Sequence, residues 1–235
     1  MKLTIYAAIG AGLLSATSAS AVEITGGSLK LSYSTFASET DLSRLGIEGS
    51  TELAFTQKFS MQLDLGYQNM GESDLDGSAI GVHAIYHLDN ATSLGGFYTR
   101  EKVNGASLDL YGVEAGYETG QWDFEGNLGR TSTDGDDATI FGASARYEFA
   151  NQLGLTGSYD TVDMGMFDIS RATIALDRNV SDNVNLFLEV GSAKFSADGL
   201  SASEPFVGIG GKIAFGAERG ATFDQRGILR LLPGL

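Results

Sequence analysis

The sequence predicts an all-β protein, a single antiparallel up-and-down transmembrane β-barrel of about 12 strands, with about 10 to 14 strands compatible with the pattern. Three observations lead to this prediction. Apolar and polar residues alternate in segments of about ten residues, short and longer connectors alternate, and aromatic residues group beside the short connectors. No run after residue 21 approaches the roughly 18 apolar residues of a transmembrane helix, so a membrane position would require strands closed into a barrel.

The alternation is clearest over residues 59–67, where apolar residues occupy every odd position. Successive strand residues point to opposite faces, so such a segment has one apolar and one polar face. Twelve segments of this kind can be counted, at 26–38, 43–56, 59–69, 78–88, 92–103, 107–119, 122–133, 138–149, 153–163, 168–178, 184–196 and 205–215. The segment at 92–103 is the least regular, because the adjacent Phe97 and Tyr98 compete for the apolar face.

The connectors between these segments predict the topology. Short ones stand at 57–58, 89–91, 120–121, 150–152 and 179–183. Those between them are longer and rich in Gly, Asp and Ser, for example at 71–77, 132–137 and 197–204. Outer-membrane barrels have short periplasmic turns and longer external loops. We therefore expect both termini on the periplasmic side, with six outer loops and five inner turns.

Aromatic residues beside the short connectors favour lipid over water as the surroundings of the barrel. They are Phe55, Phe59, Tyr86, Tyr117, Trp122, Tyr147, Phe149 and Phe215. Amphipathic rings at one level suit the headgroup region of a bilayer. The alternative is a soluble periplasmic or secreted β-protein, which would also alternate but would usually carry its charges outside.

The N-terminus predicts export. Lys2 gives a positive start, residues 5–14 form a short apolar core, and Ala19 to Ala21 form a small-residue cleavage site, as in a signal peptide. The expected organisation is a signal peptide at 1–21, an outer-membrane barrel at 22–216 and a C-terminal periplasmic tail at 217–235. The chain has no Cys, so an exported fold must be stable without disulfides.

Charge and composition exclude several classes of function. The net charge of −15 argues against nucleic acid as a partner, because its binding needs a basic face. Without Cys there is no thiolate metal site or cysteine nucleophile. His83 and His87, four residues apart on one strand, stand about 13 Å apart, too far to share one metal ion. The acidic loop residues lack the spacing of an EF-hand, and residues 22–235 contain no Gly-x-Ser-x-Gly stretch, so we expect no metal, no cofactor and no enzyme.

The last alternating segment resembles the insertion signal of outer-membrane barrels, with matches at Gly210, Ile213 and Phe215. It departs at Gly208, where a polar residue is usual, and further residues follow Phe215. The chain from residue 22 onward, with Gly-Ala-Thr-Phe-Asp at 220–224, resembles the porin-like barrels of alphaproteobacteria. The resemblance implies a passive outer-membrane channel for small hydrophilic solutes, with membrane lipid, lipopolysaccharide and the barrel assembly machinery as partners. The chain also departs from general porins, which have about 16 strands and a long constriction loop, because it has room for about 12 strands and none of its loops is long enough for such a constriction.

The polar faces predict an acidic lumen. The candidate pore-lining residues are Glu48, Glu52, Asp64, Glu114, Glu118, Asp123, Glu125, Arg146, Glu148, Arg171, Glu189 and Lys212. Carboxylate rings in a pore favour cations, so the predicted channel prefers cations. The alternative is an occluded interior, in which these groups form a salt-bridged core of a non-conducting structural or surface-interaction barrel.

The tail after Phe215 differs in composition from the strands. It carries Arg219, Arg226 and Arg230, and residues 228–232 are mostly apolar. One interpretation is a basic plug that enters the acidic lumen. The preferred one is a mobile periplasmic extension.

Overall fold

The computed structural model describes residues 22–71, 75–132, 137–165, 167–197, 200–216 and 220–233. The strands are β1 (Glu23–Phe36), β2 (Ser43–Ala54), β3 (Phe59–Met70), β4 (Leu75–His87), β5 (Thr92–Val103), β6 (Ala106–Thr119), β7 (Trp122–Ser132), β8 (Asp137–Glu148), β9 (Leu153–Asp163), β10 (Phe167–Ser181), β11 (Val184–Ala197) and β12 (Leu200–Gly216). A 3-10 helix, η1 (Leu229–Leu231), follows them. The signal peptide expected at 1–21 lies outside the described residues. Within the described ranges, no helix is long and apolar enough to cross a membrane.

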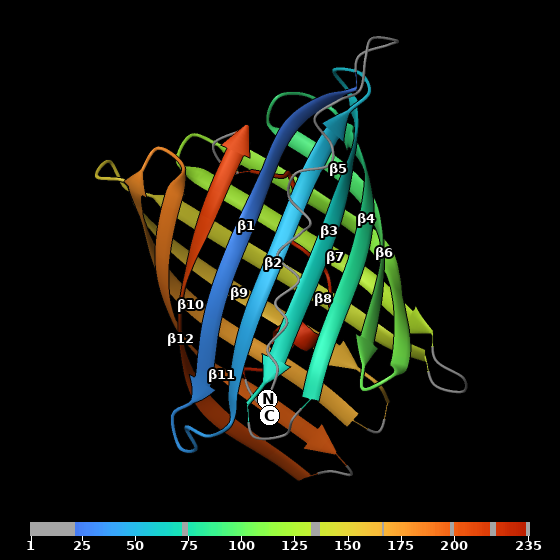
Figure 1. Cartoon of the computed structure of the whole chain (residues 1–235), viewed down its shortest axis with the longest axis vertical. Coiled ribbons are helices and arrows are strands. Elements are labelled where there is room, and N and C mark those ends of the chain that lie inside the picture. The colour runs from blue at the N-terminus through green and yellow to red at the C-terminus, as the bar shows by residue number, and fades with distance from the viewer. Residues whose placement is uncertain are drawn as a thin grey trace, which may run out of the picture.

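The strands form one closed antiparallel barrel (Figure 1). Each strand pairs with its neighbour in the sequence, and β1 pairs with β12 over the register Gly26↔Gly216 to Phe36↔Phe206. Because closure leaves no strand edge, the hydrogen bonds of the sheet are satisfied around the whole ring, as lipid requires. The predicted fold class and the count of 12 strands are confirmed.

Two details differ from the expectation. β12 begins at Leu200, earlier than expected, and includes Pro205. Proline is tolerated there because the ladder with β1 ends at Phe206, so its missing N–H is not needed on that side. The connectors also differ less in length than expected, because β4 and β12 extend into segments that had been assigned to loops.

We call the two ends of the barrel by their connectors. The turn end carries those at 55–58, 88–91, 120–121, 149–152 and 182–183. The loop end carries those at 37–42, 71–74, 104–105, 133–136, 164–166 and 198–199. The expected number of six loops and five turns is confirmed, whereas their assignment to the two sides of the membrane stays a prediction.

The outer face of the barrel is apolar. Exposed side chains include Leu29, Leu31, Leu63, Leu65, Ile80, Val113, Leu128, Ile174, Leu188, Val190, Val207 and Ile209. In the irregular strand β5, Tyr98 points outward and Phe97 points inward, where its side chain is buried. A lipid-facing surface explains so many exposed apolar residues, which a water-soluble protein rarely shows.

The aromatic residues of the turn end form a belt on this outer face. Ring centroids are 4.8 Å apart for Phe59 and Tyr86 and 4.9 Å apart for Trp122 and Tyr147. Tyr147 also contacts Phe149 at 4.9 Å. These contacts across neighbouring strands confirm the predicted grouping, which suits one headgroup level of a bilayer.

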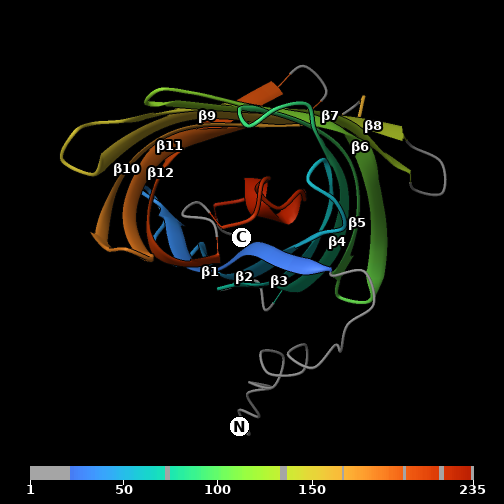
Figure 2. The ribbon, with the colours of Figure 1, turned by 90° about the horizontal axis from the view of Figure 1, so that it is seen from above.

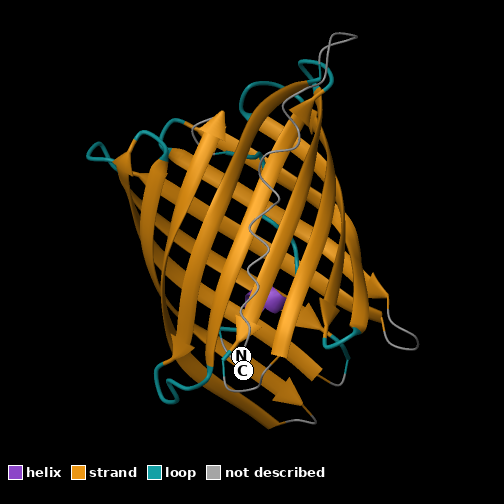
Figure 3. Cartoon of the chain, in the orientation of Figure 1, coloured by secondary structure: helices purple, strands orange, loops and turns teal. Residues whose placement is uncertain are grey.

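The C-terminal segment lies inside the barrel. Viewed along the barrel, the red segment that ends the chain sits within the ring of strands (Figure 2). Its helix η1, purple in Figure 3, is likewise enclosed by strands. Residues 220–233 therefore do not form the mobile extension that was preferred from the sequence. They adopt the plug arrangement, because their basic and apolar side chains both find partners on the inner wall, as described next.

Candidate functional site: the barrel lumen

The candidate lining residues occupy the lumen face. Glu52, Asp64, Glu114 and Arg171 are buried there. The larger cavity of the barrel is lined by Glu118, Asp123, Glu125, Arg146, Glu148, Glu189 and Lys212. Glu48 pairs with Lys30, whose side chain also lines this cavity. The facing read from the alternation thus brings all twelve to one surface, while their part in conduction stays a prediction.

A buried charge cluster links the wall to the tail near mid-lumen. His83, fully buried, lies 2.8 Å from Asp64 (Nε2 to Oδ2) and 2.6 Å from Glu114 (Nδ1 to Oε1). Arg226 of the tail approaches the other Glu114 oxygen, Oε2, at 2.8 Å and Glu125 at 2.6 Å. Carboxylates removed from water need such partners, so Arg226 completes a network that the wall begins.

Backbone groups of the tail are also bonded by wall side chains. Gln62 donates to the carbonyl of Phe223 at 2.7 Å and accepts its N–H at 3.0 Å. Glu52 accepts the N–H of Thr222 at 2.8 Å. Glu101 accepts the N–H of Ile228 at 3.0 Å. The inner wall therefore satisfies backbone hydrogen-bonding groups of the tail, as a neighbouring strand would, but it does so through side chains.

Two arginines and a serine hold the far end of the tail. The carbonyl of Arg230 accepts hydrogen bonds from Arg44 at 3.0 Å and from Arg171 at 2.6 Å. Ser34 donates to the carbonyl of Pro233 at 2.7 Å. All three wall side chains are buried and stand toward the loop end of their strands. The tail thus runs from the turn end, where β12 finishes, to the loop end.

An apolar layer fills the lumen at the loop end. Ile228 and Leu231 pack with Phe97, Leu110, Ala138, Ile140 and Val162. Leu229 and Leu232 pack with Met70 and Ile169. Leu110 and Val162 are 0% exposed, and the other residues of this layer are at most 9% exposed. We call these four tail residues and their wall partners the apolar layer.

One glycine shows how closely the wall fits the tail. A Cβ atom at Gly77 of β4 would collide with the side chain of Leu229. The strand pairing itself does not require a glycine at this position, because Gly77 lies in a regular part of the β3–β4 and β4–β5 ladders. Because Gly77 has no side chain, it leaves a space, here called the seat, which the side chain of Leu229 fills.

A polar cavity of about 700 Å³ occupies the rest of the lumen, alongside the tail. Its wall includes the turns at 120–121, 150–152 and 182–183, so it opens at the turn end. Nine acidic and five basic side chains line it, which leaves an acidic surface. Arg230 lies at its inner limit, where the tail approaches the apolar layer.

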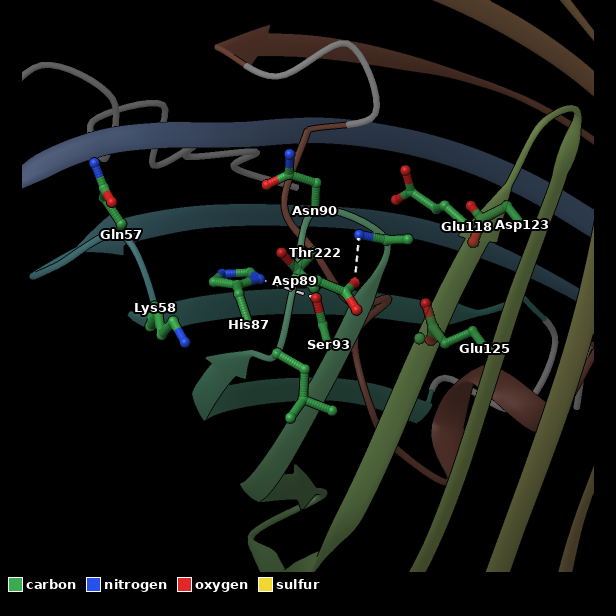
Figure 4. A pocket seen from close by; sticks show the side chains of 13 residues that line it. Gln57, Lys58, His87, Asp89, Asn90, Ser93, Glu118, Asp123, Glu125 and Thr222 are labelled. Atoms are coloured by element: carbon green, nitrogen blue, oxygen red, sulfur yellow. Dashed lines mark hydrogen bonds between the residues drawn. The ribbon is translucent and has the colours of Figure 1, made fainter.

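A smaller cavity of about 310 Å³ lies beside it at the turn end. Figure 4 shows Glu118, Asp123 and Glu125 gathered on one side, with Lys58 and His87 across from them. Ser93 lies 2.9 Å from Nδ1 of His87. The entrance is therefore polar, with carboxylates from β6 and β7 on one wall.

The histidines act as partners of polar wall groups. His83 bridges two carboxylates, whereas His87 contacts Ser60 at 3.0 Å and Ser93 at 2.9 Å. No group of three or more His, Cys, Asp or Glu residues among the described ranges is arranged to hold a metal ion. The expectations of no metal and no cofactor stay predictions.

Sequence reasoning missed the residues that receive the tail. Apolar residues at the loop-end parts of several strands point inward, and strict alternation treats them as irregularities. Phe97 beside Tyr98 was the visible signal, since two adjacent aromatic residues require one to face the lumen.

The residues of the predicted insertion signal lie at the turn-end half of β12. Ile213 and Phe215 are exposed on the outer face. Gly210 faces the lumen beneath Phe187, where a Cβ atom would collide with the ring. Their part in assembly stays a prediction.

A closed barrel with an apolar outside and a charged inside has the form of an outer-membrane β-barrel protein. The chain belongs to the Gram-negative porin family, whose sequence model matches residues 16–198. The protein is therefore a channel of the outer membrane for small solutes. Residues 220–233 lie beyond the matched range. A comparison with curated protein sequences gives no match.

Solved outer-membrane channels share the fold. The KdgM porin aligns with a TM-score of 0.63 at 10% identity, covering 80% of this chain and 99% of that one. The NanC porin aligns with a TM-score of 0.61 at 8% identity, covering 80% and 98%. The COG4313 outer membrane channel from Pseudomonas putida F1 aligns with a TM-score of 0.56 at 12% identity, covering 84% and 97%.

Proposed function

We propose that the protein is a passive channel for small hydrophilic solutes that prefers cations. The observation that carries the proposal is the lining of the larger cavity, with nine acidic and five basic side chains. Fixed carboxylates raise the local concentration of cations and repel anions, most strongly where low-dielectric walls focus the field. Solutes pass down their own gradient, and no catalytic step is part of the proposal.

Three of the five basic residues of the cavity, Lys30, Arg146 and Arg226, are paired with carboxylates, and the nine acidic side chains outnumber all five. Arg146 contacts Asp177 and Glu148, each at 2.8 Å. Lys30 lies 3.4 Å from Glu48. Arg226 is held between two glutamates, as described above. A paired guanidinium offers little to a passing anion, because its donors are already bonded.

This pairing bears on the class of solute. One structure of the KdgM porin holds an oligogalacturonate. A chain of uronic acids carries one carboxylate per sugar, and cationic side chains with free donors would favour its passage. The acidic cavity here favours neutral and cationic solutes instead.

We also propose that the turn end faces the periplasm. The short connectors at this end, and the end there of β12, the strand that resembles an insertion signal, support this orientation. In this orientation lipopolysaccharide surrounds the loop end, and the barrel assembly machinery reads Gly210, Ile213 and Phe215. The chain would reach the outer membrane through the periplasm after removal of residues 1–21.

The experiment is a reversal potential. Protein refolded without residues 1–21 is placed in a planar bilayer with a tenfold KCl gradient, which sets an ideal cation potential of about 59 mV. A reversal on the cation side supports the proposal, and Asp123→Asn with Glu148→Gln should move it toward zero. A reversal on the anion side would overturn the cation preference.

A second candidate function follows from one observation, the apolar layer at the loop end. A barrel closed by such a layer would serve as a structural or surface-interaction protein if the closure were permanent. The absence of conductance from inserted protein under every condition, including after loss of the tail, would favour this alternative.

A further inference from the structure

We propose that residues 220–233 are a displaceable plug, and that the barrel carries a specific internal docking site for this segment of its own chain. The inference rests on the proposed channel function, because a plug has meaning only where solutes pass. In this proposal the C-terminal segment is the gate of the channel, and the closed barrel surrounds it.

The tail closes the lumen at one end only. The larger cavity opens at the turn end, and none of the loop-end connectors lines it. At the loop end, Leu229, Leu231 and Leu232 complete an apolar layer with wall residues that are almost completely buried. Ions do not cross a dry layer of this kind, because removing their hydration costs far more than any contact there returns.

The ring of strands closes without the tail. Hydrogen-bonded registers connect all twelve strands in a ring, and residues 220–233 contribute no strand to it. The tail is joined to the ring at Gly216, with Gly220 beginning the described segment, and both have positive φ values of 76° and 88°. A chain that turns back through glycines at the turn end can leave by the same end.

The contacts between wall and tail are specific enough to make a docking site. Three levels of the wall each recognise a different part of the tail. Gln62 brackets Phe223 at the turn-end side, Glu114 binds Arg226 in the middle, and Arg44 and Arg171 converge on the carbonyl of Arg230. Two guanidinium groups that meet on one carbonyl, beside a seat shaped by Gly77, fix the depth to which the tail enters.

The wall groups that bind the tail can form hydrogen bonds with water instead. Glu52, Glu101 and Glu114 bind tail N–H groups or Arg226, and all three would be hydrated in an open lumen. The exchange of these bonds for water makes release of the plug less costly than loss of an equal number of contacts from a sealed core. The apolar layer opposes release, so the closed state is the resting one.

The experiment locks and removes the plug in the same barrel. The natural chain has no Cys, so Gly77→Cys with Leu229→Cys gives one possible disulfide between wall and plug. Single-channel currents are recorded from four proteins shown to be folded and inserted: unmodified chain, oxidised double variant, the same variant after reduction, and a chain that lacks residues 217–235. The two single-Cys variants, which cannot form the bond, serve as matched controls.

The expected result is rare openings of the unmodified chain, fewer than a tenth as many in the oxidised variant, and recovery on reduction. The shortened chain should be open most of the time, and a synthetic peptide of residues 217–235 should close it when added from one side. Equal opening of the oxidised and reduced double variants, while the shortened chain conducts as the full one does, would overturn the plug and leave the channel intact. Silence of the folded shortened chain would overturn the channel itself.

Discussion

The Nε atom of Arg226 lies 2.8 Å from Oε2 of Glu114, and both side chains are buried in the lumen. This contact joins the last segment of the chain to the middle of β6. Removing one partner of a buried ion pair typically costs about 3–5 kcal/mol when the other stays buried. When Arg226 is removed here, the tail can leave the lumen and water can hydrate Glu114. The lost pairing energy therefore favours the open state and does not unfold the barrel.

Replacing Arg226 should therefore open the channel without unfolding it. Arg226→Ala is expected to raise the fraction of time spent open by at least tenfold, because each factor of ten needs only about 1.4 kcal/mol. The measurement is single-channel recording beside urea unfolding of the same sample. Arg130→Ala, at an exposed position, is the matched control. An unchanged open fraction in Arg226→Ala would show that the buried pair does not hold the tail.

Filling the seat at Gly77 should loosen the tail by a steric route. Gly77→Leu puts a side chain where Leu229 packs, so the plug loses its depth of entry. Trypsin cleavage after Arg226 and Arg230 should become about tenfold faster, since proteolysis follows the population of the released state. Gly157→Leu is the control, because nothing lies within 4 Å of a Cβ built at Gly157. Equal cleavage rates in the two variants would contradict the fit described here.

An arginine on the outer face should destabilise the barrel. Leu63 and Leu188 are 39% and 57% exposed on the surface assigned to lipid. Leu63→Arg or Leu188→Arg is expected to lower the free energy of unfolding by roughly 2–4 kcal/mol near the bilayer midplane. Ser158→Arg, which places the same side chain in the cavity, should cost much less. Urea unfolding in liposomes makes the comparison, and a similar loss in all three variants would mean that the facing is wrong.

Loss of the tail should strengthen the preference for cations. Glu52, Glu101 and Glu114 would lose tail partners and face the lumen. Two basic side chains, Arg226 and Arg230, would leave the cavity together with only one carboxylate, that of Asp224. The reversal potential of a chain without residues 217–235 should therefore move further to the cation side. Arg226→Gln with Arg230→Gln in the full chain separates the charge of the tail from its bulk. A shift toward anions after truncation would argue against an acidic wall.

The strands and their facing could be predicted because a barrel in lipid imposes a simple rule. Leu63 faces outward and Asp64 faces the lumen, and the sequence shows this alternation without any knowledge of strand pairing. Strand ends were less predictable. β12 continues to Leu200 because it pairs with β11 as far as Ala197, and Pro205 is tolerated because the ladder with β1 ends at Phe206. No local pattern contains these facts of register.

The docking of the tail could not be chosen from the sequence for a related reason. Arg226 and Glu114 stand far apart in the chain, and their contact depends on how deeply residues 220–233 enter. An acidic lumen and a basic tail made a plug conceivable. What decided it was the apolar layer, whose wall residues, such as Leu110 and Val162, come from separate strands and meet only after closure.

We infer that the protein is an acidic channel whose conductance is limited by its own C-terminal segment. This inference is tested by the single-channel current of the folded full chain, without residues 1–21, in a planar bilayer with a tenfold KCl gradient. A plugged acidic channel should give infrequent steps whose reversal potential lies on the cation side. Frequent, unobstructed steps that reverse on the anion side would contradict both the acidic lumen and the plug.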